Sequence, residues 1–127
     1  MVKGIEHTAI ASPDPERLAR WYVDYLGFAI NYQSKTSRTV FVKTPDGSMI
    51  EIIEASGPNA GVTPMNAPGL RHMALTVDDF EGSCARLREL GVSFLTEPAT
   101  KGGNSTVFFA DLDGNILHLL KRETPMP

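Results

Sequence analysis

The sequence predicts an α+β fold built from two similar halves, each with the order strand, helix and then about three strands. Three observations support this: an internal repeat, one amphipathic helical segment in each half, and short apolar segments separated by turn residues. The 127 residues are enough for one domain with a buried core. The composition, 42% hydrophobic and 21% charged, is that of an ordinary soluble globular chain.

The clearest repeat joins two segments that lie late in the two halves. Arg38–Ile53 reads RTVFVKTPDGSMIEII and Ser105–Leu120 reads STVFFADLDGNILHLL. Thr-Val-Phe and Asp-Gly recur at the same offsets in both. Apolar residues follow the glycine, and one polar residue interrupts them at the fourth position, which is Glu51 in the first copy and His118 in the second.

The beginnings of the halves match as well. Gly4–Ser12 reads GIEHTAIAS, and Gly69–Val77 reads GLRHMALTV. Each has a glycine, two residues, a histidine and then a short apolar run typical of a strand. His7 and His72 are therefore equivalent positions of the repeat.

The first half continues with a helix predicted over Asp14–Leu26, where apolar residues recur at helical spacing. An acidic residue begins it and Gly27 follows it, as is typical of helix ends. A turn at 45–47 (Pro-Asp-Gly) separates the last two strands. The strands predicted after the helix are Phe28–Gln33, Arg38–Thr44 and Met49–Glu54.

The second half follows the same order. A helix is predicted over Asp78–Leu90, closed by Gly91, and a turn over 113–115 (Asp-Gly-Asn). The strands predicted after this helix are Ser93–Thr96, Thr106–Ala110 and Ile116–Lys121.

Between the halves, residues 55–68 are rich in Gly, Pro, Asn and Ser, a composition that favours a linker. We expect one domain over 1–127, with module one at about 1–55, a linker at about 56–68 and module two at about 69–122.

Charge and composition exclude several classes of partner. The net charge is −3 with no basic run, so nucleic acid is not an expected partner. No apolar stretch approaches the roughly 18 residues of a membrane span, and the N-terminus lacks the apolar region of a signal peptide. One cysteine allows no internal disulfide. We therefore expect a cytoplasmic protein that does not bind membranes.

Four polar residues interrupt the apolar strands at positions related by the repeat. They include all three histidines of the chain, His7, His72 and His118, and the fourth is Glu51. A carboxylate inside Met-Ile-Glu-Ile-Ile is costly unless it is paired or bound to a cation. A divalent metal ion would satisfy it together with neutral imidazoles. One buried histidine alone is more often a hydrogen-bonded core residue, but four symmetric positions favour a metal site.

Strand parity predicts where these side chains point. Glu51 shares a face with Met49 and Ile53, while the residues between them point the other way. If the helices cover that second face, the four polar residues line the concave face of a curved sheet.

These motifs resemble the vicinal oxygen chelate superfamily, which includes glyoxalase I, extradiol dioxygenases, methylmalonyl-CoA epimerase, and fosfomycin and bleomycin resistance proteins. The resemblance covers about Gly4 to Arg122 and rests on GIEHTAI, WYVDYLGF, TPDGSMIEII, GLRHMALTV and ADLDGNILHLL. It implies two tandem βαβββ modules that form a cupped, barrel-like mixed sheet around a metal ion, with helices outside. It also implies a homodimer that binds a small-molecule substrate. The implied ligands are His7, Glu51, His72 and His118.

One position departs from the family pattern, in which the last ligand is usually Glu in DPDGNxIE; here it is His118. Glu51 is then the one carboxylate ligand left to act as a base. We expect a divalent ion (Fe, Ni, Zn, Mn or Co) and a lyase or isomerase that stabilises an enediolate or oxyanion on a substrate with adjacent oxygens. Glu51 would both bind the ion and move the proton.

Two alternatives stay open. One is an Fe(II) extradiol-type dioxygenase that cleaves a catechol or similar diol. The other is a resistance protein that sequesters a ligand without chemistry, although that type normally lacks the ligand residues. Arg38, Lys101 and Asn104 lie near strand starts and could meet an anionic group of the bound molecule.

Overall fold

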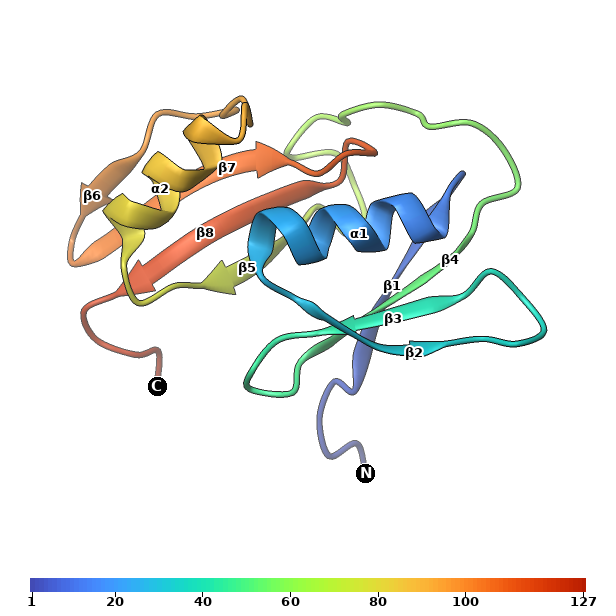
Figure 1. The fold of residues 1–127 in the computed structure, drawn as a ribbon. Helices are drawn as coiled ribbons and strands as arrows, with labels where there is room; N and C mark the ends of the chain where they lie inside the picture. The colour runs from blue at the N-terminus through green and yellow to red at the C-terminus, as the bar shows by residue number, and fades with distance from the viewer. The chain divides into compact units, whose positions relative to one another are not determined.

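The computed structural model describes residues 1–127, which divide into two compact units, 1–59 and 60–127 (Figure 1). Each unit has one helix and one four-stranded mixed sheet, with the element order strand, helix and three strands. The predicted α+β fold of two βαβββ modules is thereby confirmed.

In the first unit the sheet has the strand order β1-β4-β3-β2. The first and last strands, β1 and β4, are parallel neighbours, and the other pairs are antiparallel. Figure 1 shows α1 lying along one face of this sheet. The elements are β1 (His7–Ser12), α1 (Pro15–Leu26), β2 (Ala29–Gln33), β3 (Val40–Lys43) and β4 (Met49–Glu54).

Helix α1 begins and ends where its capping residues dictate. The Asp14 side chain accepts a hydrogen bond from a backbone N–H of the first turn, and proline occupies the first turn, where its missing N–H costs nothing. Gly27 closes the helix in the left-handed conformation at φ 75°. Leu18 and Tyr22 are completely buried, and they pack the helix against the sheet. On β4 the alternate residues Ile50 and Ile52 are buried as well, so the residues between them point to the opposite face.

The second unit repeats this arrangement with the strand order β5-β8-β7-β6. Again the first and last strands, β5 and β8, are parallel neighbours. Helix α2 starts after the Asp79 side chain, which accepts from a backbone N–H of the first turn, and it packs on β7 and β8. The elements are β5 (His72–Thr76), α2 (Phe80–Glu89), β6 (Ala99–Lys101), β7 (Asn104–Ala110) and β8 (Ile116–Arg122).

One predicted strand, Ser93–Thr96, is wrong. That segment makes only one isolated bridge, between Phe94 and Phe109, and the edge strand lies further along the chain at β6. A side-chain oxygen here takes the place of a backbone acceptor. The hydroxyl of Thr96 accepts the hydrogen bond from the backbone N–H of Phe108 at 3.0 Å, whereas regular strand pairing would use a backbone carbonyl. Regular pairing resumes after this interruption.

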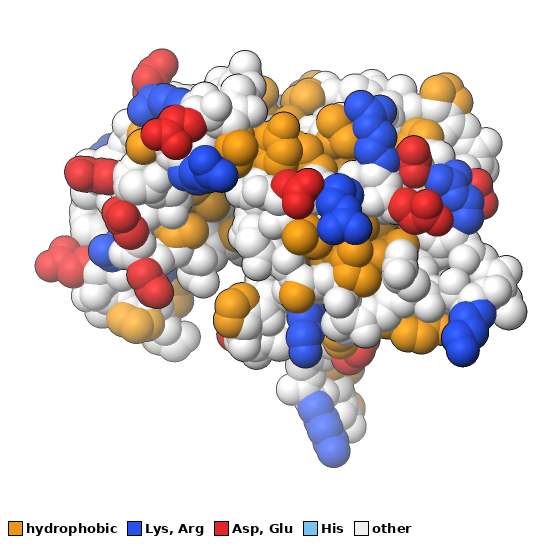
Figure 2. Space-filling view, in the orientation of Figure 1, with side chains coloured by type: hydrophobic (Ala, Val, Ile, Leu, Met, Phe, Trp, Pro, Cys, Tyr) orange, Lys and Arg blue, Asp and Glu red, His pale blue; other side chains and the backbone are white.

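Neither helix has the length and apolarity needed to cross a membrane. On the face shown in Figure 2, Lys and Arg side chains lie among Asp and Glu side chains and form no separate basic area.

The two predicted Asp-Gly turns are present, and both glycines have the positive φ that disfavours other residues: Gly47 at 92° and Gly114 at 91°. Their surroundings differ. A Cβ at Gly47 would meet nothing within 4 Å, whereas one at Gly114 would lie 3.0 Å from the carbonyl carbon of Gly61 and 3.1 Å from the amide of Val62. In the second unit, residues 61 and 62 of the linker therefore pack directly on the β7–β8 turn.

This pair of glycines yields a matched test of that contact. Gly47→Ala should lower the free energy of unfolding by about 1–2 kcal/mol from backbone strain alone. Gly114→Ala should lower it by at least about 1 kcal/mol more, because backbone atoms must also shift. Urea unfolding followed by circular dichroism measures both, and equal losses would contradict the close approach of the linker.

Candidate metal site

In the first unit, parallel pairing brings two of the predicted ligands together. His7 begins β1 and pairs with Met49, and Ala9 pairs with Glu51, so the His7 and Glu51 side chains point to the same face. The Nε2 atom of His7 lies 3.2 Å from Oε2 of Glu51. Both side chains are partly exposed, 36% and 26% respectively, so an ion can reach them.

The other ring nitrogen of His7 also has a carboxylate partner, which the sequence did not suggest. Nδ1 of His7 contacts Oε2 of Glu6 in the preceding position. The hydrogen bond with Glu6, with added attraction from Glu6 and Glu51, raises the pKa of His7. A carboxylate on one ring nitrogen directs the other nitrogen toward a metal ion. At the equivalent place in the second half the residue is Arg71, so only His7 has this partner.

In the second unit the same register brings the other two predicted ligands together. Ala74 pairs with His118 on the neighbouring parallel strand, and His72 is two residues before it on the same face. The ring centroids of His72 and His118 are 5.5 Å apart, at 81° between their planes.

His118 is the most constrained of the four residues. Both of its ring nitrogens are buried and have no hydrogen-bond partner. Burial, followed by the neighbouring His72 and Arg122, lowers the pKa of His118 and keeps the imidazole neutral near pH 7. A buried imidazole without a partner is costly. A neutral imidazole with a free nitrogen is also the form that binds a metal ion.

Each pair lies beside a phenylalanine supplied by the repeated Thr-Val-Phe. Phe41 pairs across the sheet with Glu51 and makes an edge contact with the His7 ring at 5.5 Å. Phe108 pairs with His118 and stacks on it, with centroids 4.1 Å apart and planes 10° apart. The repeated phenylalanine is visible in the sequence, but only the strand pairing shows that it lies beside a predicted ligand.

The donor atoms suit a divalent ion. Two donors, each about 2.1 Å from one ion, are about 3.0–3.4 Å apart at octahedral or tetrahedral angles. The 3.2 Å between His7 Nε2 and Glu51 Oε2 lies within that range. Neither unit alone gathers three or more His, Cys, Asp or Glu side chains in a group that could hold a metal ion. Each unit brings its own two predicted ligands together and provides half of the predicted set.

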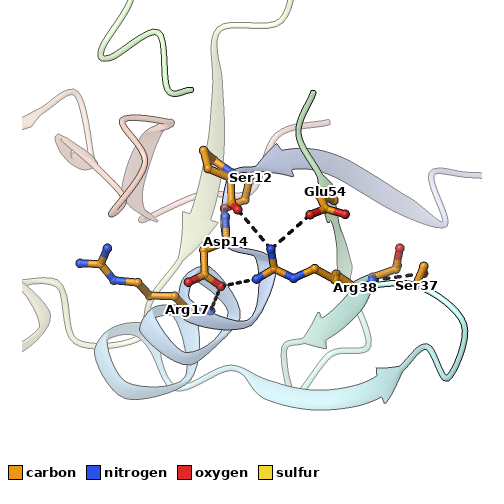
Figure 3. Close-up of polar contacts among 8 residues, drawn as sticks. Ser12, Asp14, Arg17, Ser37, Arg38 and Glu54 are labelled. Atoms are coloured by element: carbon orange, nitrogen blue, oxygen red, sulfur yellow. Dashed lines mark hydrogen bonds and ion pairs between the residues drawn. The ribbon is translucent and has the colours of Figure 1, made fainter. Parts of the chain in front are cut away.

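Three residues were expected to bind an anionic group of the ligand. One of them, Arg38, already has protein partners (Figure 3). Its guanidinium contacts Asp14 at 2.8 Å, Glu54 at 3.2 Å and the carbonyl of Pro13 at 3.4 Å. These contacts join the end of β1 and the start of α1 to the end of β4. Glu51, by contrast, is near the beginning of β4, so Arg38 has a structural role at the other end of the strand.

Comparison with known proteins assigns the family. A family model described as the glyoxalase/bleomycin resistance protein/dioxygenase superfamily matches residues 4–119, nearly the whole chain. The chain belongs to this superfamily. The resemblance seen in the sequence motifs is therefore confirmed.

Several known proteins resemble the chain along most of its length. It is 31% identical to the uncharacterized protein YwkD of Bacillus subtilis (strain 168), over 96% of this chain and 99% of that one. It is 28% identical to a probable lactoylglutathione lyase of Synechocystis sp., covering 91% and 92%. A crystal structure of a glyoxalase family protein from Enterococcus faecalis has a TM-score of 0.74 and 29% identity, covering 94% and 98%.

His7 and His118 have different surroundings in this glyoxalase-like fold. We therefore expect their pKa values to be shifted in opposite directions. In metal-free protein, His7 should keep its proton above the ordinary histidine pKa of about 6.5, because carboxylates stabilise the imidazolium. His118 should lose its proton below that value, because burial disfavours the charged ring. Histidine ring signals in an NMR pH titration measure both pKa values.

Glu6→Gln should lower the pKa of His7 and leave that of His118 unchanged, since Glu6 is the largest cause of the His7 shift. Arg71→Gln, at the equivalent place beside His72, is the control for a general charge effect. A His7 pKa that does not move in Glu6→Gln would show that the Glu6 contact is absent in solution.

Proposed function

We propose that the protein is a metal-dependent enzyme, a lyase or isomerase of the glyoxalase type, acting on a small substrate with adjacent oxygens. The proposed ligands of the divalent ion are His7, Glu51, His72 and His118. Two donors come from each unit, either of one chain or of two chains in a homodimer.

The observation that carries this proposal is the repeated pairing of donors on one face of each sheet. His7 Nε2 and Glu51 Oε2 are separated by the distance that two ligands of one ion have. His118 has two buried ring nitrogens without partners next to His72. Membership of a superfamily that includes glyoxalases and dioxygenases supports the same chemistry.

Bound at these residues, a divalent ion would supply a Lewis acid that lowers the energy of negative charge on the substrate oxygens. Glu51 has the second role, transfer of the substrate proton. Its carboxylate is 26% exposed and is a proton acceptor on the histidine face of the sheet. Because the equivalent residue His118 has a lowered pKa and buried ring nitrogens, it is suited to hold an ion and poorly suited to gain a proton.

The metal stoichiometry gives the first test. Tag-free wild type should contain or take up one divalent ion for each set of four ligands. His7→Ala and His118→Ala should each lower the affinity for that ion by at least about tenfold, since each removes one donor. Elemental analysis and competition with a chromophoric chelator measure content and affinity.

Asn31→Ala is a control on β2, at the opposite edge of the sheet from β1; its side-chain amide lies 3.4 Å from the Met49 sulfur. Protein that takes up none of Fe, Ni, Zn, Mn or Co would exclude the metal site and favour a ligand-sequestering protein. Oxygen uptake with Fe(II) and a panel of catechols would instead identify a ring-cleaving dioxygenase.

The role of Glu51 gives the second test. Glu51→Gln keeps the size and one oxygen donor but removes the base, so metal content should largely remain. Proton transfer should fall by about 100-fold or more. Loss of the C–H signal of dihydroxyacetone and of methylglyoxal–thiol adducts in deuterium oxide, followed by NMR, reports this transfer.

Glu54→Gln is the matched control, because Glu54 lies on the same strand and contacts Arg38 at the other end. Unchanged exchange in Glu51→Gln, or an equal loss in Glu54→Gln, would eliminate Glu51 as the base.

A further inference from the structure

Three polar residues stand side by side across three strands of the second unit. Lys101 of β6 pairs with Asn104 of β7, and Asn104 pairs with Arg122 of β8. Directly paired residues share a face of the sheet, and so do alternate residues along one strand. Because Arg122 is four residues after His118 on β8, all three lie on the face that carries the histidine pair.

The two cations of this group have no carboxylate partner. No Asp or Glu oxygen lies within 4.0 Å of the Lys101 amine or the Arg122 guanidinium, unlike Arg38 with its two ion pairs. The nearby Glu123 carboxylate is directed at Gly103, where an added Cβ would lie 2.8 Å from its Oε2. Neither cation therefore forms a direct ion pair, although the Glu123 carboxylate lies over the adjoining turn.

The local structure fixes the strand positions of the three residues and joins two of their side chains. Nη1 of Arg122 donates to Oδ1 of Asn104 at 3.2 Å, which orients the guanidinium and leaves the amide N–H groups of Asn104 free to donate. Lys101 and Asn104 flank a two-residue turn of Gly102 and Gly103, whose φ values are 58° and 78°. Positive φ at both positions is the requirement of a tight hairpin turn. The three donors thus project from regular strands rather than from a loop.

The distance between this group of three residues and the histidine pair is one that a single small molecule can span. Four residues along a strand place the Cα atoms of His118 and Arg122 about 13 Å apart. An extended ligand of a few carbon atoms can therefore span the two.

We propose that Lys101, Asn104 and Arg122 form a subsite for an oxyanion group, carboxylate or phosphate, at the far end of the substrate. This rests on the proposed function, in which the adjacent oxygens at the other end meet the ion. The two cations attract the group, and the guanidinium and amide give it directed hydrogen bonds. The substrate class is then a chelating acid whose charged group is separated from its chelating oxygens by several bonds.

Probes that carry a chelating end and a variable tail test this subsite. We would use monohydroxamates of linear dicarboxylic acids with three to six methylene groups, their methyl esters, and phosphonate-tailed counterparts. Calorimetry on the metal-loaded protein should show the charged tail binding at least about tenfold more tightly than the ester at the best chain length. Comparison of carboxylate with phosphonate distinguishes the two oxyanions.

Arg122→Gln should remove most of this preference for the charged tail, and Lys101→Gln part of it, while both bind the methyl esters as wild type does. Lys121→Gln is the matched control, because Lys121 is next to Arg122 and points to the opposite face. Equal affinities of charged and ester tails for wild type, or an equal effect of Lys121→Gln and Arg122→Gln, would overturn the proposal.

A measurement without metal separates this subsite from the proposed function. Inorganic phosphate added to metal-free protein should shift the side-chain amide signals of Asn104 in NMR, and Arg122→Gln should abolish the shift. If the protein takes up no ion but phosphate shifts Asn104, the subsite stands and the proposed function fails. If phosphate leaves Asn104 unmoved in wild type, the subsite is rejected whether or not an ion binds.

Discussion

The parallel pairing of the first and last strands in each unit determines the rest of the arrangement. Parallel neighbours cannot be joined by a tight turn, so a helix and two further strands fill the connection. The helix packs on one face of the sheet, and the two strands extend the sheet. The pairing also places the histidine that opens the first strand next to the third residue of the last strand. The repeated geometry of the two ligand pairs follows from this one register.

Much of the fold could be predicted because the strand, helix and turn patterns of the sequence occur twice, once in each half. The strand Met49–Glu54 was predicted with its observed bounds, since alternating burial and a strong turn define both ends. The failure at Ser93–Thr96 has a local cause: a threonine hydroxyl replaces a carbonyl as acceptor, and apolar composition does not reveal such a competition.

The candidate site was less predictable from the sequence, because it depends on which charged side chains form ion pairs in the folded chain. Parity placed Glu51 on the correct face, but only tertiary contacts show that Arg38 is held by Asp14 and Glu54. Arg122 was overlooked, because it stands at the end of a strand where alternation no longer distinguishes the two faces. Its neighbours across the sheet, which assign its face, are far apart in the sequence.

The stacking of Phe108 on His118 affects the thermodynamics of binding. A ring held at 4.1 Å against a flat neighbour has few rotamers left, and edge contact with His72 restricts that ring too. Side-chain conformational entropy is thus lost when the chain folds rather than when a ligand arrives. Phe108 therefore favours a rigid donor over a flexible one, and its substitution would alter affinity without removing any donor atom.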